Sequence, residues 1–257
     1  MDYIRVIPCL DIKDGRLVKG INFIDIKDLG DPVEAAYAYS QAGADELTFL
    51  DISATLEGRG LLLDTVARIL DRISIPLIVG GGIASMGDIE RILDAGVAKL
   101  SIASAAIKDP GLIREAAKKF GSQPIIVAID AKSRPDGGYN VYTRAGTTDT
   151  GIDVVDWAKE LEQLGAGEIL LTSMDTDGTK MGFDIRLTRQ VTEAVTIPVI
   201  ASGGAGRLEH FAEAVTEGGA SAVLAASLFH YGELSIFEVK KYLREKSIAV
   251  RMDESHG

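Results

Sequence analysis

The sequence predicts one eight-stranded parallel β/α barrel that spans residues 1–257. Three observations support this fold class: the length, the alternation of apolar runs with amphipathic segments, and an internal repeat. A barrel of this kind needs roughly 250 residues, which the chain has as a single domain. Its two halves are expected at about 1–122 and 123–250, followed by a tail at 251–257.

Eight short apolar runs provide the expected strands. Their nearly continuous hydrophobic character is typical of parallel strands that are covered on both faces. Turn residues and a segment with helical periodicity follow most of the runs. The strands are expected at 4–11, 46–52, 76–81, 99–104, 124–130, 168–174, 198–204 and 222–227. This periodicity predicts helices at 31–43, 60–72, 86–96, 110–121, 153–165 and 207–219.

The internal repeat favours a barrel over a doubly wound open sheet, the main alternative. The chain resembles itself with a shift of about 120 residues. Two halves of four βα units can close into a symmetric barrel whose matching sites face each other. The matched segments are Ile75–Gly82 with Ile197–Gly204, Leu10–Lys13 with Ile129–Lys132, and Ser101–Ser104 with Leu224–Ser227.

Composition limits the possible partners and the location of the protein. A net charge of −11 argues against binding to nucleic acid or to an anionic membrane surface. The one cysteine, Cys9, fits a reducing cytoplasm. The N-terminus lacks a signal pattern, and no apolar run approaches the ~18 residues of a membrane span. No metal-ligand spacing is present, so we expect no metal and no other cofactor.

Two aspartates, Asp11 and Asp130, end the first and fifth predicted strands, which lie opposite each other in an eight-stranded barrel. Residues two apart share one face of a strand, so Cys9 and Asp11 point the same way. If these faces point inward, both carboxylates reach the mouth of the barrel, where they can move protons on two sides of a substrate. The alternative is that each caps the following turn, but their matching places in the repeat argue against it.

Glycine and serine mark two further sites, one in each half of the repeat. Glycines let the backbone approach phosphate oxygens, and barrels commonly bind phosphate after strands seven and eight. Two sites on opposite sides of the mouth indicate a substrate that is phosphorylated at both ends. The first site is predicted at Gly81, Gly82 and Ser104, and the second at Gly203, Gly204, Ala226 and Ser227.

Other polar residues at strand ends are candidates for hydrogen bonds to substrate: Asp51, Thr172, Asp177 and Ser202. Turn capping is an equal alternative for Asp51. The long segment at 17–30 is predicted as a lid loop from which Lys19 could reach a substrate phosphate. His210 is expected on the exposed side of its helix.

Four charged residues open strands at the bottom of the predicted barrel: Arg5, Glu46, Lys99 and Glu168. Two positive and two negative side chains could close a ring of ion pairs around the pore. From the residues alone, a stabilising or simply solvated set of charges is the favoured interpretation.

Several long segments between about residue 3 and residue 251 resemble those of a known protein family. They are IPCLDIKDGRLVKG, DELTFLDI, VGGGI, FGSQPIIVAIDAK, GAGEILLTSMDTDGTKMGFD and IASGGAGRLEHF. These segments resemble the cyclase subunit of imidazole glycerol phosphate synthase, a family of histidine biosynthesis. The resemblance implies a reaction between ammonia and a bisphosphorylated ribulosyl-formimino aminoimidazole carboxamide ribonucleotide. The products would be imidazole glycerol phosphate and the aminoimidazole carboxamide ribotide.

The resemblance also implies roles for residues. Asp11 and Asp130 match the acid–base pair of the family, and the glycine, serine and other polar candidates match its substrate contacts. The four charged residues match a gate that admits ammonia from a glutaminase subunit docked below the barrel. This match changes our preference for these charges from stability to a gate.

The chain departs from the family pattern at Ala98 and Ala103, where the family usually has an acidic residue and Asn. Ala145 is a further departure, where Ser or Gly is frequent. Three alternatives stay open: the sister isomerase of the same pathway, a related sugar-amidating enzyme, and a barrel that binds without catalysis.

Overall fold

The computed structural model describes residues 3–21, 24–54, 62–144 and 146–252. For residues 19–21 and 24–27 it describes the backbone but not the side chains. Eight parallel strands form a closed barrel, in the order β1, β4, β5, β6, β7, β10, β11 and β12, with β12 paired to β1 and β10 paired to β7. Their bounds are Arg5–Lys13, Leu47–Asp51, Leu77–Gly80, Lys99–Ile102, Ile125–Ser133, Glu168–Ser173, Val199–Ser202 and Ala222–Ala225, in that order. All eight predicted strands are confirmed, and the open sheet is excluded.

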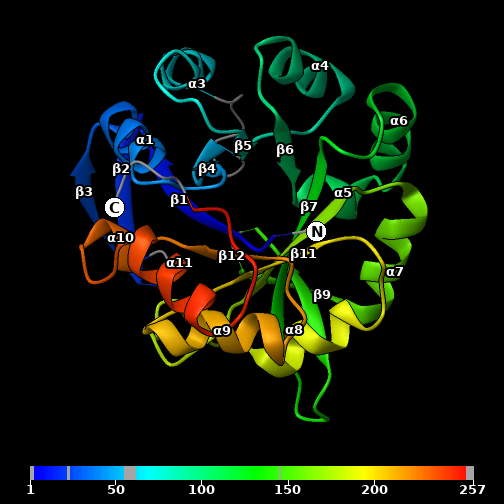
Figure 1. Cartoon of the computed structure of the whole chain (residues 1–257). Coiled ribbons are helices and arrows are strands. Elements are labelled where there is room, and N and C mark those ends of the chain that lie inside the picture. The colour runs from blue at the N-terminus through cyan, green and yellow to red at the C-terminus, as the bar shows by residue number, and fades with distance from the viewer. Residues whose placement is uncertain (1–2, 22–23, 55–61, 145, 253–257) are drawn as a thin grey trace.

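Helices surround the barrel (Figure 1). The six predicted helices are α1 (Pro32–Gln41), α3 (Leu63–Leu70), α4 (Met86–Asp94), α6 (Gly111–Phe120), α7 (Val154–Leu164) and α9 (Leu208–Thr216). The structure adds α5 (Ser104–Lys108), α8 (Ile185–Thr192), α10 (Ser227–His230) and α11 (Ile236–Glu245). Among the described residues, no helix is long and apolar enough to cross a membrane.

Local sequence explains where the helices begin. The side chain of Asp31 accepts a hydrogen bond from the N–H of Val33 at the start of α1, where Pro32 is the first helical residue. Asp153 caps α7 in the same way. At α11, Ser235 and Glu238 form a reciprocal capping box. These caps fix the first residues of the three helices.

Apolar residues fill both sides of the barrel wall. Inside, a layer of side chains from six of the strands closes the centre of the barrel: Ile7, Cys9, Ile78, Ile126, Leu170, Ile200, Ala222 and Leu224. Outside, alternate residues such as Val6 and Leu10 pack under the helices, in two larger clusters. This alternation explains why the strands read as continuous apolar runs, and the packed interior leaves the strand ends as the place for a site.

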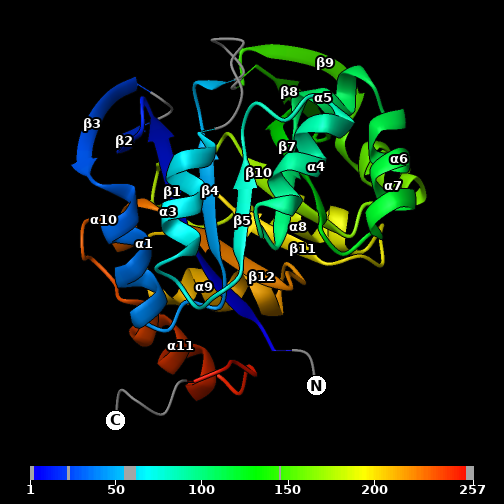
Figure 2. The same ribbon diagram turned by 90° about the horizontal axis from the view of Figure 1, so that it is seen from above.

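Two antiparallel hairpins extend the barrel strands that stand opposite each other. The predicted loop at 17–30 is wrong in its local structure, because β2 (Arg16–Ile21) and β3 (Ile24–Gly30) form a hairpin that continues β1. In the second half, β8 (Tyr139–Thr143) and β9 (Thr148–Asp153) continue β7 in the same manner. Figure 2 shows both hairpins at the end of the barrel toward which the strands point, away from the two termini. This correspondence agrees with the predicted two-fold repeat.

Candidate active site

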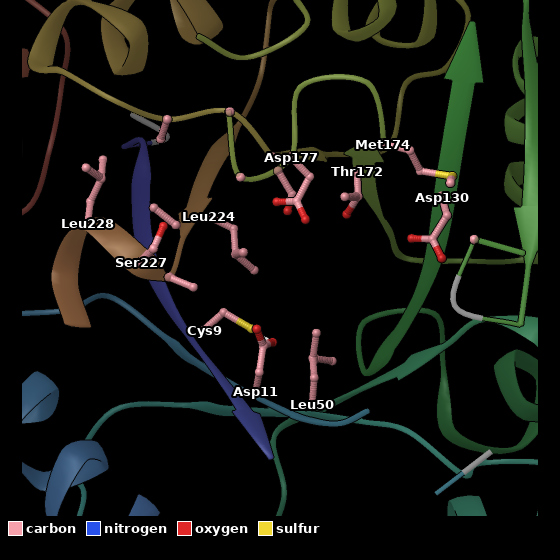
Figure 3. A pocket seen from close by; sticks show the side chains of 18 of the residues that line it. Cys9, Asp11, Leu50, Asp130, Thr172, Met174, Asp177, Leu224, Ser227 and Leu228 are labelled. Atoms are coloured by element: carbon pink, nitrogen blue, oxygen red, sulfur yellow. Dashed lines mark hydrogen bonds between the residues drawn. The ribbon is translucent and has the colours of Figure 1, made fainter. Parts of the chain in front are cut away.

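A cavity of about 450 Å³ opens at the carboxyl ends of the barrel strands. Most of the predicted site residues line it: Asp11, Asp130, Thr172, Asp177, Ser202, Gly203, Gly204, Ala226 and Ser227. Figure 3 shows the labelled side chains among them, such as Asp11, Asp130 and Asp177, gathered around one space from segments that are far apart in the sequence. The cavity therefore lies where β/α barrels carry their active sites.

Asp11 and Asp130 point into this cavity from opposite strands (Figure 3). In the strand order of the closed barrel, β7 is the fourth strand from β1 in either direction. Asp11 is 8% exposed, and its Oδ1 atom accepts a weak hydrogen bond from Cys9 Sγ at 3.5 Å. The predicted opposition of the two carboxylates is thus present in the fold.

The pKa of Asp130 is raised to about 6, first by burial and then by the negative charge of Asp177. Burial disfavours the charged carboxylate, and a like charge nearby adds to this effect. A carboxyl group with a pKa near neutrality can both release and take up a proton at moderate pH, which suits general acid–base chemistry.

Glycines allow the backbone to approach closely at both predicted phosphate sites. Gly81 and Gly82 have φ of +99° and +67°, and Gly203 and Gly204 have φ of +89° and +102°. A Cβ atom at Gly81 would lie 2.2 Å from the carbonyl oxygen of Asp51. Both pairs therefore need glycine, and in the second pair these residues form one wall of the cavity.

The two halves differ in what they contribute to the cavity. Of the described residues, Gly81, Gly82 and Ser104 do not line it, although Ser104 begins α5 as Ser227 begins α10. The preceding residues Ala103 and Ala226 have similar φ, −115° and −119°. The two serines therefore occupy matching helix starts, while residues of the second half form most of the cavity lining.

Among the described residues, the predicted substrate contact Asp51 does not line the cavity. Asp51 accepts hydrogen bonds from Ala54 N at 3.1 Å and from Ser53 Oγ at 3.4 Å, which is the geometry of a turn cap. Its backbone also lies against Gly81, so the turn contacts agree with the capping alternative, and substrate binding by Asp51 stays a prediction. Lys19 belongs to β2, but its side chain lies outside the described residues, as does Ala145.

Lys132, Thr147 and Met174 also line the cavity, and the sequence analysis did not select them. Lys132 follows Asp130 by two residues, so strand alternation alone could have found it. Its Nζ atom lies 5.7 Å from the centre of the Tyr142 ring on β8. Thr147 comes from the β8–β9 hairpin, which the sequence analysis did not predict. In the described part of the chain, no group of three or more His, Cys, Asp or Glu residues could hold a metal ion.

The four charged residues at the opposite end of the barrel form a closed ring of ion pairs. Arg5 Nη1 lies 2.9 Å from Glu46 Oε2, and Lys99 Nζ lies 2.7 Å from Glu46 Oε1 and 3.1 Å from Glu168 Oε2. Arg5 also pairs with Glu168. Burial lowers the pKa of Arg5, but hydrogen bonds and charges from Glu168 and Glu46 outweigh it, so the pKa is raised. The ring predicted from sequence is present, and its two positive and two negative charges balance.

A closed β/α barrel with opposed carboxylates in the cavity at its strand ends is a barrel enzyme. The family model described as "Histidine biosynthesis protein" matches residues 5–235. Two relatives, from two strains of Caulobacter vibrioides, are each named "Imidazole glycerol phosphate synthase subunit HisF". Each is 57% identical over 254 residues, which cover 98% of this chain and 98% of the relative. The chain belongs to this family of histidine biosynthesis enzymes, in its HisF cyclase branch, as its sequence segments indicated.

Proposed function

We propose that the chain joins ammonia to the bisphosphorylated ribulosyl-formimino aminoimidazole carboxamide ribonucleotide and closes an imidazole ring. The products are imidazole glycerol phosphate and the aminoimidazole carboxamide ribotide. The observation that carries this proposal is the pair of opposed carboxylates, Asp11 and Asp130, across one cavity with a glycine wall. The 57% identity to the HisF subunits supports the same reaction.

The substrate would lie across the mouth of the barrel with a phosphate at each end. Gly203, Gly204 and Ser227 would hold one phosphate through backbone N–H groups and the serine hydroxyl. Gly81, Gly82 and Ser104 would hold the other phosphate in the first half, where glycine geometry matches. Thr172, Asp177 and Ser202 line the cavity between the strands of the second half and would bind the sugar hydroxyls.

The two aspartates would divide the proton transfers between them. Ammonia attacks the substrate ketone, and water leaves as a C=N bond forms. The new nitrogen then bonds to the formimino carbon to close the ring, while the C–N bond to the aminoimidazole carboxamide ribotide breaks. These steps each need a proton donor and an acceptor. Asp130, whose pKa is raised to about 6, holds a proton more readily than an exposed aspartate and would donate it to the departing group. Asp11, on the opposite strand, would accept protons on the other side of the ring.

The ion-pair ring would act as the entry for ammonia at the other end of the barrel. The relatives are named as subunits, and a glutaminase subunit docked beneath Arg5, Glu46, Lys99 and Glu168 would supply ammonia there. Ala98, next to Lys99, removes one acidic docking contact that the family usually has, without removing the ring. We expect this protein to work in the cytoplasm, and that location stays a prediction.

The test measures product formation from the ribulosyl substrate and ammonium by the wild type, Asp11→Asn and Asp130→Asn. Each variant is expected to lose about 10²–10⁴-fold in turnover, the contribution of one general acid or base, while substrate still binds. Asp71→Asn, at an exposed aspartate at the end of α3, is the matched control and should keep full turnover. Turnover near that of the wild type in both variants would contradict the proposed pair. Conversion of the aldose precursor without ammonia would instead support the isomerase.

A further inference from the structure

His210 lies in the first turn of α9, and its ring is buried, not exposed as the sequence analysis expected. Its exposed fraction is 4%. The backbone N–H of Gly206 donates a hydrogen bond to His210 Nδ1 at 3.1 Å. Because Nδ1 accepts this bond, the neutral ring carries its proton on Nε2. The reaction proposed above assigns no role to this buried imidazole.

The ring covers a seam between the loops that follow β10 and β11. A Cβ at Gly206 would lie 2.0 Å from the carbonyl oxygen of Lys180, and a Cβ at Gly204 would lie 2.0 Å from that of Gly182. The N–H of Gly182 donates to the carbonyl of Gly204 at 2.8 Å. A Cβ at Gly182 would be 3.5 Å from the imidazole of His210. The imidazole therefore packs on one loop and holds the other by a hydrogen bond.

Both loops form walls of the cavity. The loop after β10 contributes Asp177 and Gly178, and the loop after β11 contributes Gly203, Gly204 and Ala205. Gly206 directly follows this wall and directs its N–H away from the cavity toward the helix. Without the acceptor, that N–H would be left unsatisfied at a tightly packed seam, and the wall could turn to find another partner.

We propose that His210 is a positioning residue: by accepting the Gly206 N–H, it holds the Gly203–Gly204 backbone in the orientation that binds a substrate phosphate. The inference rests on the proposed function, because it takes this wall to be a phosphate site. His210 is not among the residues that line the cavity, so it acts through the backbone and not by contact with substrate. The alternative is that His210 only packs at the start of α9, and the test must distinguish this structural role from the positioning role.

Two substitutions make this separation. In His210→Asn the amide oxygen takes the place of Nδ1 and can accept the Gly206 N–H. In His210→Gln the polar end takes the place of Nε2, so the bulk is kept but the acceptor is not. With ammonium as nitrogen donor, we expect His210→Gln to raise KM for the bisphosphorylated substrate about 5–10-fold, the effect of one lost hydrogen bond. The value of kcat should stay within about twofold, and His210→Asn should restore KM to within about twofold.

Acid pH gives a second readout, since protonation of Nδ1 removes the acceptor. Burial and then Arg207 lower the pKa of His210, and Glu213 and Glu209 oppose them weakly. On the facing loop, Lys180 is paired with Glu233. The wild type should therefore show a rise in KM below pH 6.5, the ordinary pKa of histidine. His210→Asn should lack this rise, while the titration of Asp130 still shapes kcat in both proteins.

Amide hydrogen exchange at Gly206 tests the hydrogen bond without reference to catalysis. We expect slow exchange in the wild type and in His210→Asn, and fast exchange in His210→Gln. If His210→Gln keeps the KM of the wild type, or if His210→Asn is as impaired as His210→Gln, the positioning role is wrong. Turnover by the wild type would in those cases leave the proposed function intact. A wild type that forms no product from the ribulosyl substrate would overturn the proposed function, and this inference with it.

Discussion

At the scale of single residues, Asp130 shows how an active site lowers the stability of its own fold. Its pKa rises from 3.8 in a free chain to about 6 in the folded protein, through burial and the charge of Asp177. Between these two pH values the folded protein binds more protons than the unfolded chain. The free energy of unfolding therefore falls as pH rises from 4 to 6, and it stays lower above pH 6.

Asp130→Asn removes this penalty. We expect it to raise the free energy of unfolding above pH 7 by up to about 3 kcal/mol, the equivalent of roughly two pKa units, and to change it little near pH 4. Urea unfolding at the two pH values measures the difference, with exposed Asp71→Asn as the control. An equal change at both pH values would show that burial of the Asp130 charge does not cause the stability change.

The burial of His210 and the role of Asp51 could not be predicted from the sequence. The order of eight strands correctly placed Asp11 and Asp130 on opposite strands, and alternation, which is a local pattern, predicted the face on which each lies. The burial of His210 depends on the loop after β10, which is distant in sequence, so helical periodicity did not reveal it. Asp51 was equally balanced between capping and substrate binding, and only the hydrogen bonds of the turn favour capping.

At the scale of elements, the glycines of the phosphate wall should respond to substitution differently from glycines elsewhere. Gly204→Ala places a Cβ 2.0 Å from the carbonyl oxygen of Gly182 at a φ of +102°, so the two loops must separate. We expect a loss of about 2–4 kcal/mol in stability and a clear rise in KM. Gly121→Ala, at the end of α6, has a φ of +81° with nothing within 4 Å. This control should cost only about 1 kcal/mol and leave KM unchanged.

Helix α11 is joined to the bottom of the barrel by a buried ion pair. Lys240 Nζ donates to Asp45 Oδ1 at 2.8 Å and to the carbonyl of Gly43 at 2.7 Å. Asp45 also accepts from the N–H of Val6 on β1 at 2.8 Å, and Arg251 approaches it at 3.3 Å. One carboxylate thus connects the first strand, the last long helix and the C-terminal segment.

Breaking this pair on one side should be costly, because it leaves a charge buried without its main partner. We expect Lys240→Met to lower the free energy of unfolding by about 3–5 kcal/mol, and the double variant with Asp45→Asn to recover part of the loss. Lys241→Met, at the exposed next position on the same helix, is the control. Additive effects of the two changes would contradict a coupled pair.

The elements that the sequence analysis missed share a physical cause. The strands β8 and β9 are short and antiparallel. Because β9 is largely polar and exposed, its sequence has no apolar run that would predict a strand. The hairpin of β2 and β3 is stabilised through its pairing with β1, which the segment at 17–30 does not encode by itself. The barrel strands were predictable because helices cover one face and the barrel interior the other, and this burial imposes a strong pattern.

At the scale of the whole molecule, single strands join the ion-pair ring at one end of the barrel to the cavity at the other. On β1, Arg5 belongs to the ion-pair ring and Asp11 to the cavity, with Ile7 and Cys9 between them. On β10, Glu168 and Thr172 repeat this order. Along these two strands the inward-facing charges thus lie at the ends, and an apolar layer inside the barrel separates the ion-pair ring from the cavity.

The ring makes a prediction that distinguishes entry of ammonia from chemistry. Lys99→Met leaves Glu46 and Glu168 with Arg5 as their only partner within the ring, so the closed arrangement cannot persist. With the glutaminase subunit and glutamine, we expect less product for each glutamine hydrolysed. With ammonium alone, turnover should stay within about twofold, because the cavity at the other end is unchanged.

The control is Lys118→Met, which removes an exposed lysine from α6 on the outside of the barrel. Both variants are compared for ammonium-dependent turnover, glutamine-dependent turnover and thermal unfolding. Equal losses with the two nitrogen donors would mean that the ring serves the fold and not the passage of ammonia. A selective loss with glutamine in Lys99→Met, while ammonium-dependent turnover is kept, would instead assign the ring to the entry side, even where the lost ion pairs lower the unfolding temperature. Ammonia entry and ring closure would then be separable functions, located at the two ends of the same parallel strands.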